Sequence, residues 1–119
     1  MHSKTVVLAV EDEPFVRLAA IEMLEDAGYA VLHATDADEA IKLLESHPEI
    51  RLLFTDVQMP GSMDGVRLVE ACRKRWPPVR IVVTSGNPRP AQLSDDVRFL
   101  PKPYDAATLG ANLVAALHA

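Results

Sequence analysis

Short apolar runs alternate with longer stretches of helical periodicity along most of this chain, and that alternation limits the folds open to it. Each run is rich in branched apolar residues, which is typical of a strand covered on both faces. The stretches between the runs repeat apolar residues at helical spacing. An alternation repeated five times predicts a parallel sheet with helices on both faces, joined by right-handed crossovers.

Local signals give the predicted elements their limits. Pro14 suits the first turn of a helix and Gly28 its end, and Asp36 with Glu39 forms a capping box. Only a weak pattern covers residues 87–96. The predicted strands are 5–10, 29–33, 52–56, 79–84 and 97–100, and the predicted helices are 14–27, 36–47, 65–75 and 105 to the terminus.

Length and composition point to one globular domain. The chain has 119 residues, of which 49% are hydrophobic and 24% charged, so it has room for one core and for no second domain. No apolar run approaches the ~20 residues that span a bilayer, and the start of the chain is too short for a signal peptide. We therefore expect a cytoplasmic protein without a membrane segment.

The charged residues and the cysteine indicate proteins as partners. Cys72 is alone, which excludes an internal disulfide, and the four histidines show no metal-ligand spacing. The formal net charge is -5, and Arg73–Arg75 is the one basic cluster. Direct binding to nucleic acid therefore has little electrostatic support.

The stretch from Leu52 to Gly65 holds the residue on which the functional argument depends. Bulky apolar residues lead into Asp56, and Met59–Gly61 then ends any regular element. A buried strand that stops at a carboxylate holds that acid at the edge where parallel sheets bind ligands. By itself, such an acid is as often a turn or cap residue. Our hypothesis is that Asp56 is a nucleophile that becomes phosphorylated.

Polar residues also follow other predicted strands, and a parallel sheet brings them to the same edge. Glu11 and Asp12 follow the first strand, Ser85 the fourth and Lys102 the fifth. Carboxylates gathered in one cleft repel one another unless a cation binds them, and an all-oxygen site suits Mg²⁺. With that cation and the Lys102 ammonium to neutralise an incoming phosphoryl group, Asp56 would attack phosphorus in line.

Four motifs at these strand ends match a known family. They are Val10–Pro14, Asp56 with Met59–Gly61 and Asp64–Gly65, Thr84–Gly86, and Lys102–Tyr104. Together, over essentially the whole chain, they resemble the receiver domain of bacterial two-component response regulators. The resemblance implies a flavodoxin-like fold with strand order 2-1-3-4-5, and phosphorylation that depends on Mg²⁺ or Mn²⁺. It implies a histidine kinase or a histidine phosphotransfer protein as phosphodonor and a downstream protein as target.

The resemblance also bears on domain organisation. We expect residues 1–119 to form one receiver domain with no output domain, which makes the chain a single-domain response regulator. The alternative is a receiver from a hybrid histidine kinase or a larger regulator. We expect no enzymatic turnover beyond assistance to the chain's own phosphorylation and slow dephosphorylation.

Four residues are implied to form the phosphorylation and metal site. Carried over by position, Glu11 and Asp12 are similar to the family's acidic metal-binding pair. Asp56 matches the phosphoacceptor, which is also a metal ligand. Gln58 would supply a third ligand through its backbone carbonyl.

Four further residues are implied to bind the phosphoryl group or to switch with it. Lys102 resembles the phosphate-binding lysine, and Pro103 resembles the cis-proline that aims it. Ser85 matches the switch hydroxyl, which moves to bond a phosphoryl oxygen. Phe99 lies at the place of the aromatic ring that then turns inward and reshapes a protein-docking face.

One segment departs from the family pattern. Ser85 and Phe99 are 14 positions apart, fewer than the family usually has, and Pro88 and Pro90 fall inside this gap. The fourth helix of the family pattern must therefore be very short, irregular or absent. We do not expect the dimer contacts that many regulators make through it.

Two other classes of protein are weaker alternatives. An aspartyl-phosphate phosphatase of the haloacid dehalogenase type would have an acid two residues after its nucleophile, where this chain has Gln58. A flavodoxin relative that binds FMN would need a phosphate loop after the first strand, and the acids of Glu11–Glu13 would repel a phosphate there.

Overall fold

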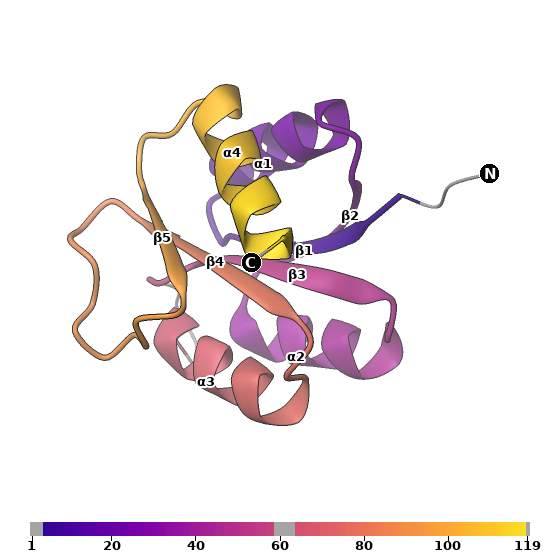
Figure 1. Cartoon of the computed structure of the whole chain (residues 1–119), viewed down its shortest axis with the longest axis vertical. Helices are drawn as coiled ribbons and strands as arrows, with labels where there is room; N and C mark the ends of the chain where they lie inside the picture. Colours follow the sequence, from indigo (N-terminus) through magenta and orange to yellow (C-terminus); the bar gives the residue numbers. More distant parts are fainter. Residues whose placement is uncertain (1–3, 59–63, 119) are drawn as a thin grey trace.

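The structure, a computed structural model, describes residues 4–58 and 64–118 and shows a five-stranded sheet between helices (Figure 1). The Met59–Gly61 part of the second motif lies outside the described residues. The strands are β1 (Val6–Val10), β2 (Ala30–Ala34), β3 (Ile50–Asp56), β4 (Arg80–Ser85) and β5 (Arg98–Pro101). The helices are α1 (Pro14–Asp26), α2 (Ala37–Ser46), α3 (Gly65–Arg75) and α4 (Ala106–Leu117).

The strands pair in parallel in the order β2-β1-β3-β4-β5, which confirms the predicted fold and strand order. The strand limits lie within two residues of the predicted ones. In the register of β3 and β4, Asp56 lies opposite Thr84. Because the strands are parallel, their carboxyl ends meet at one edge of the sheet, where the predicted site residues lie.

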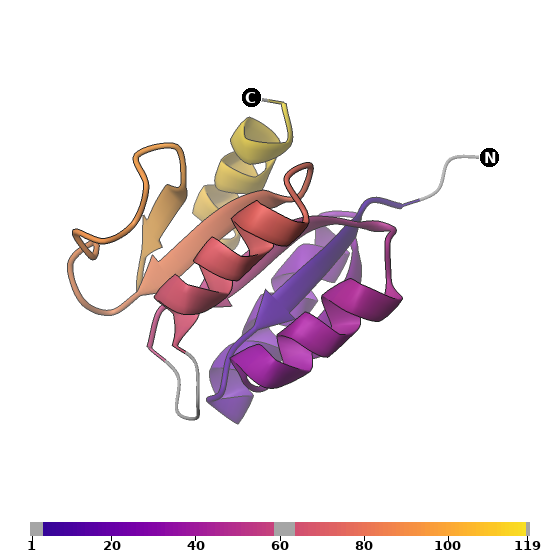
Figure 2. The same cartoon turned by 90° about the horizontal axis from the view of Figure 1, so that it is seen from below.

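Helices cover both faces of the sheet, as Figure 1 and Figure 2 show from two directions: α1 and α4 lie on one face, and α2 and α3 lie on the other. On the face of α1 and α4, Leu24, Leu109 and Leu113 belong to the same buried cluster as Phe54 and Val82. The other face, with α2 and α3, has a second buried cluster. Residues an even number apart along a strand share a face, so each strand residue can be assigned to one of these two cores.

The described helices have 10 to 13 residues, and each begins at an acidic N-cap. Asp36 Oδ1 accepts from the Glu39 N–H at 2.8 Å, as expected for the capping box. The Glu39 carboxylate in turn accepts from the Thr35 N–H at 3.1 Å, one residue before the cap. Within the part of the chain that the structure describes, no helix has the length and apolar character that a membrane span requires.

The segment between β4 and β5 departs from the alternation of strands and helices. Residues 86–97, all of which the structure describes, form turns and bends instead of a helix. Leu93 and Val97 are buried. The Arg89 guanidinium donates to the carbonyl oxygens of Ser94 and Val97, to the latter at 2.9 Å. The predicted departure is confirmed, and this side-chain clamp holds the segment where a helix is absent.

Candidate functional site

A charged bridge occupies the edge at which the strands end. Lys102 follows β5, and its Nζ donates to Glu11 Oε1 and to Asp56 Oδ2, each at 2.8 Å. Glu11 and Asp56 are 5% and 6% exposed. Ion pairs so well shielded from water interact more strongly than pairs on the surface. The structure thus brings together three predicted site residues, from the turn after β1, the end of β3 and the loop after β5.

Asp56 is fixed by the turn that follows β3. Its Oδ1 accepts from the Gln58 N–H at 3.0 Å. Gly65, the first residue of α3, passes so close that a Cβ there would lie 2.2 Å from the Asp56 carbonyl oxygen and 2.6 Å from the Val57 Cα. Only glycine fits this approach without a shift of the backbone. The glycine of the second motif therefore lets α3 begin directly beside the acid.

Glu11, Asp12 and Asp56 form a group of carboxylates, called the acid cluster below. One oxygen from each residue lies within 4.8 Å of those from the others. Arg17 Nη1 donates to the Glu11 carbonyl oxygen at 2.9 Å and holds this turn against α1. Three carboxylates are the hard oxygen donors that Mg²⁺ prefers, and exposed Asp12 leaves room for the waters that this ion retains. The donor set therefore fits a divalent cation.

Burial and the bridge act in opposite directions on the titration of Glu11 and Lys102. Burial raises the pKa of the Glu11 carboxyl, the Lys102 hydrogen bond lowers it in part, and the charge of Asp56 raises it again. Burial lowers the pKa of the Lys102 ammonium, but its hydrogen bonds to Asp56 and Glu11 outweigh this effect and leave the pKa raised. Lys102 is therefore charged at neutral pH.

The two hydroxyls at the end of β4 belong to different faces of the sheet. Thr84 lies opposite Asp56, and strand alternation places both on the face of α1 and α4. Thr84 Oγ1 is buried and has no hydrogen-bond partner within the described residues. Ser85 belongs to the other face, and its Oγ accepts from the Asn87 N–H at 3.0 Å. The motif pointed to Ser85, whereas the hydroxyl that shares a face with Asp56 is that of Thr84.

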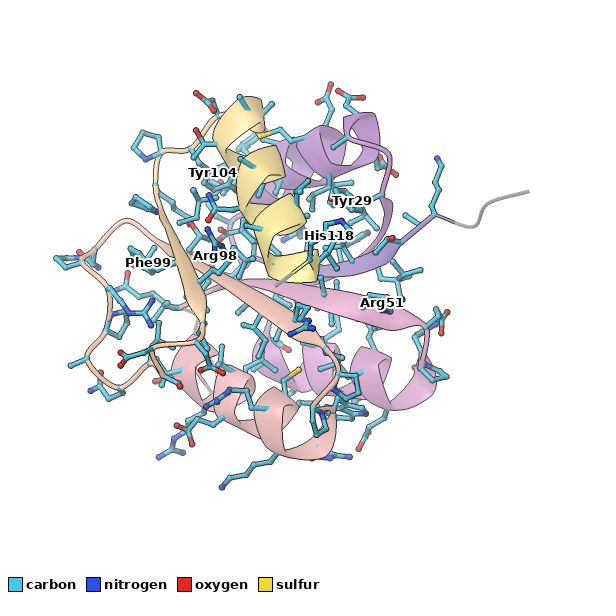
Figure 3. All side chains as sticks on the ribbon, viewed as in Figure 1. Tyr29, Arg51, Arg98, Phe99, Tyr104 and His118 are labelled. Carbon is cyan, nitrogen blue, oxygen red and sulfur yellow. The ribbon has the colours of Figure 1, made fainter. Side chains whose placement is uncertain are left out.

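The residues around Lys102 in the sequence take separate positions. Phe99 of β5, labelled in Figure 3, is half-buried against the core of the α2 and α3 face. The peptide bond between Lys102 and Pro103 is cis. Tyr104 packs its ring edge to face with Phe54, with ring centroids 5.7 Å apart. Burial raises the pKa of Tyr104 to about 12, so its phenol is neutral at physiological pH.

A groove, called the apolar groove below, opens beside the bridge between α1 and the loop after β5. It has a volume of about 560 Å³, and Phe15, Met23, Lys102 and Tyr104 are among its lining residues. Phe15 is 80% exposed, and Leu18, one helical turn further on, is 60% exposed. Large apolar side chains exposed together are typical of a surface that contacts another protein.

Comparison with known proteins identifies the family. Residues 7–113 match the family described as the response regulator receiver domain. The chain is 32% identical over 103 residues to the response regulator receiver protein CpdR of Brucella abortus, which covers 82% of this chain and 84% of CpdR. It is 34% identical over 115 residues to the sensor kinase CckA of the same species, covering 92% of this chain but only 12% of CckA.

A solved structure agrees with these matches. The receiver domain of the hybrid histidine kinase CckA has a TM-score of 0.80 to this chain at 38% identity, covering 94% of this chain and 98% of that one. The family match extends from the second residue of β1 into α4 and therefore includes residues of every strand of the sheet and both ends of the charged bridge. The chain thus belongs to the response regulator receiver domain family, whose members are signalling domains of two-component systems.

Proposed function

We propose that Asp56 accepts a phosphoryl group from a phosphorylated histidine of a histidine kinase or a histidine phosphotransfer protein, and that this changes contacts with a downstream protein. The observation that carries the proposal is the bridge from Lys102 Nζ to Glu11 and Asp56, 2.8 Å to each. It combines a nucleophilic carboxylate, a fixed positive charge and an acid that can help to hold a metal ion.

The transfer needs position and charge from the protein. A carboxylate oxygen of Asp56 attacks phosphorus while the bond from phosphorus to the donor's imidazole nitrogen breaks, and the bonding electron pair stays on that nitrogen. The products are an acyl phosphate and an imidazole that takes a proton from water. Lys102, hydrogen-bonded to Asp56 Oδ2, lies where it can neutralise charge on the phosphoryl oxygens.

A divalent cation, Mg²⁺ or Mn²⁺, belongs to this proposal. The acid cluster would hold it through Glu11, Asp12 and Asp56, and the Gln58 backbone carbonyl would be a further ligand. The bound ion would supply positive charge against the incoming phosphoryl group. Glu11 and Asp56 also contact Lys102, so these carboxylates would be shared between the ion and the ammonium.

For the switch, we propose that Thr84 rather than Ser85 is the hydroxyl that bonds the phosphoryl group. Thr84 lies opposite Asp56, and its buried Oγ1 has no hydrogen-bond partner within the described residues. A buried hydroxyl without a partner costs free energy that a new acceptor would recover. Ser85 Oγ already accepts a hydrogen bond, and it belongs to the other face. Phe99 stays the proposed aromatic residue that moves in response.

The variants Thr84→Val and Ser85→Ala separate the two hydroxyls. Each removes one hydroxyl and leaves a side chain of similar or smaller size. After phosphorylation, we expect the amide NMR spectrum of Ser85→Ala to change as in the wild type. In Thr84→Val, changes should be confined to the surroundings of Asp56, and the Phe99 ring signals should not move. The reverse pattern would return the role to Ser85.

The phosphodonor protein is proposed to dock at the apolar groove. It adjoins Lys102, so a partner helix that covers Phe15 would bring its histidine to the bridge. Phe15→Ser should slow phosphotransfer from a protein donor without affecting phosphorylation by acetyl phosphate, because a small donor does not need the docking surface. Equal slowing with both donors would contradict this role.

We also propose that the receiver acts as a single-domain regulator in the cytoplasm, without direct contact to nucleic acid or a membrane. The chain covers 84% of CpdR, a receiver protein, and 12% of CckA, a sensor kinase. The 84% coverage of CpdR favours a regulator of receiver size over a part of a hybrid kinase.

Acetyl phosphate with Mg²⁺ tests the phosphoacceptor role without a partner protein. We expect the intact mass of the wild type to rise by one phosphoryl group. The adduct should be absent in Asp56→Asn and retained in Asp95→Asn, which makes the same change at an exposed acid of the β4–β5 segment. No adduct in the wild type, under conditions that label another receiver domain, would contradict the proposal.

A further inference from the structure

A second groove opens on the α3 side of the sheet, at the opposite ends of the strands from the charged bridge. It lies between the last turn of α3 and the first residues of β4 and β5, has a volume of about 430 Å³, and is called the basic groove below. The segment that joins β4 to β5 has no helix to cover this part of the sheet (Figure 1). The lining includes apolar residues from the starts of both strands and basic residues from α3 and β4: Val79, Ile81, Val97, Arg73, Lys74 and Arg80.

Charge is distributed unevenly along this chain, and the basic groove lies in its positive part. Six of the 12 Lys and Arg residues lie between positions 73 and 98, where only two of the 17 Asp and Glu residues lie. The chain as a whole has a formal net charge of -5. A positive region on an acidic protein attracts acidic partners and orients them towards itself.

The acidic residue of the lining, Asp96, forms an ion pair that a partner can replace. Arg73 Nη2 lies 3.0 Å from Asp96 Oδ2, and the two side chains are 42% and 66% exposed. Exposed pairs of this kind are worth about 1 kcal/mol or less, so Arg73 can exchange Asp96 for another carboxylate at small cost. Lys74, next to Arg73, is also exposed at the rim of the groove.

We propose that the basic groove binds an acidic segment of a partner protein. Carboxylates of the segment would pair with Arg73 and Lys74, and an apolar side chain would cover the half-buried Val79. A groove of this volume holds a few side chains of a partner, which makes a short segment a better fit than a folded surface. The proposal does not depend on phosphorylation of Asp56, because the groove is at the other end of the strands.

Short synthetic peptides are the probe. The first has Glu residues around two central Leu residues, the second has Gln in place of each Glu, and the third has Ser in place of each Leu. We expect the first peptide to bind the full chain by fluorescence anisotropy, less tightly as salt is added, and to shift the amide NMR signals of residues 73–76, 79–81 and 96–98. The other two peptides should bind at least about tenfold more weakly than the first.

Three variants locate the binding. Lys74→Glu should weaken binding of the first peptide about tenfold, whereas Lys42→Glu, the same change at an exposed residue of α2, should leave it unchanged. Asp96→Asn should tighten it, because Arg73 loses its competing partner. Circular dichroism confirms that each variant is folded, and each should still form the phosphoryl adduct.

Several results would overturn the proposal. Equal binding by Lys74→Glu and Lys42→Glu, equal binding of the three peptides, or peptide shifts centred on the apolar groove would each contradict it. Sedimentation that shows the chain dimerising through this groove, in a manner abolished by Lys74→Glu, would assign the groove to a second copy of the chain instead.

Discussion

The ion pairs at the two ends of the β4 and β5 strands differ in how much of their side chains water reaches. At the carboxyl ends, Lys102 pairs with Glu11 and Asp56, whose side chains are 6% and 9% exposed. At the amino ends, Arg73 pairs with Asp96 where both side chains are largely exposed. Water screens the second pair and hardly reaches the first, so similar groups have different energies. The first end is suited to react with a charged group and the second to exchange partners.

The largest effect is expected where the backbone approaches the buried end. In Gly65→Ala the new Cβ would lie 2.2 Å from the Asp56 carbonyl oxygen, so the backbone must shift. We expect the free energy of unfolding in urea to fall by about 2 to 3 kcal/mol, and phosphorylation to be lost. Gly110→Ala, in α4 with nothing within 4 Å of its Cβ, is the control. It should stabilise the chain by about 0.5 to 1 kcal/mol, and equal effects at both sites would contradict the account.

The next effect compares the two ion pairs directly. Lys102→Met leaves Glu11 and Asp56 buried without their cation, and we expect the free energy of unfolding to fall by about 2 to 3 kcal/mol with the fold retained. Arg73→Met breaks the exposed pair and should cost less than about 1 kcal/mol. Mg²⁺ should recover part of the loss in Lys102→Met and none in Arg73→Met. Similar losses in the two variants would contradict the larger contribution to stability that we assign to the buried bridge.

A smaller effect concerns the pH dependence of the bridge. The folded-state pKa of Lys102 is raised above its ordinary value of 10.5, since its hydrogen bonds outweigh burial. The bridge therefore stabilises the chain fully below that value and loses its contribution as pH rises through the folded-state pKa. From neutral pH upward, the difference in free energy of unfolding between the wild type and Lys102→Met should stay constant up to this region and shrink above it.

Tyr104 adds a second alkaline contribution that is present in both proteins, because burial is the main cause of its raised pKa and the charge of Lys102 lowers that pKa only in part. Burial raises the pKa of Tyr104 to about 12, so ionisation of Tyr104 in the unfolded chain lowers stability in both proteins as pH rises. If the difference in free energy of unfolding between the wild type and Lys102→Met did not change with pH over the whole alkaline range, the role given to Lys102 would be contradicted.

The fold could be predicted from local patterns because most strands here are covered on both faces and are therefore apolar along their length. The prolines of the segment after β4 likewise excluded a regular helix, and the structure has none at residues 86–97. The meeting of Glu11, Asp56 and Lys102 followed from topology alone, since parallel strands end at one edge.

The choice between the neighbouring hydroxyls could not be made from the motif. Thr84 and Ser85 both lie at the end of β4, and a shift of one residue in register moves a side chain to the other face. The predicted strand limits differ from the observed ones by up to two residues, which is too coarse for this choice. Counting across the observed register from Asp56 gives Thr84.

The basic groove was also beyond prediction, because its lining comes from separate parts of the chain. The Arg73–Arg75 run was visible in the sequence only as a basic cluster. In the fold its residues take different positions. Arg75 pairs with Glu45 at 2.6 Å and stacks on Trp76, whereas Arg73 and Lys74 line the basic groove. Such a division depends on contacts between α3, α2 and the sheet, which no local pattern records.

The central claim is that Asp56 takes the phosphoryl group and that residues on its face of the sheet respond. The most direct test is the amide NMR spectrum of the isotope-labelled chain before and after acetyl phosphate and Mg²⁺. We predict the largest changes at Gln58, Thr84 and Lys102, smaller ones at Lys74, and none in Asp56→Asn. Changes that persist in Asp56→Asn, or an adduct that leaves Thr84 and Lys102 unaffected, would contradict the claim.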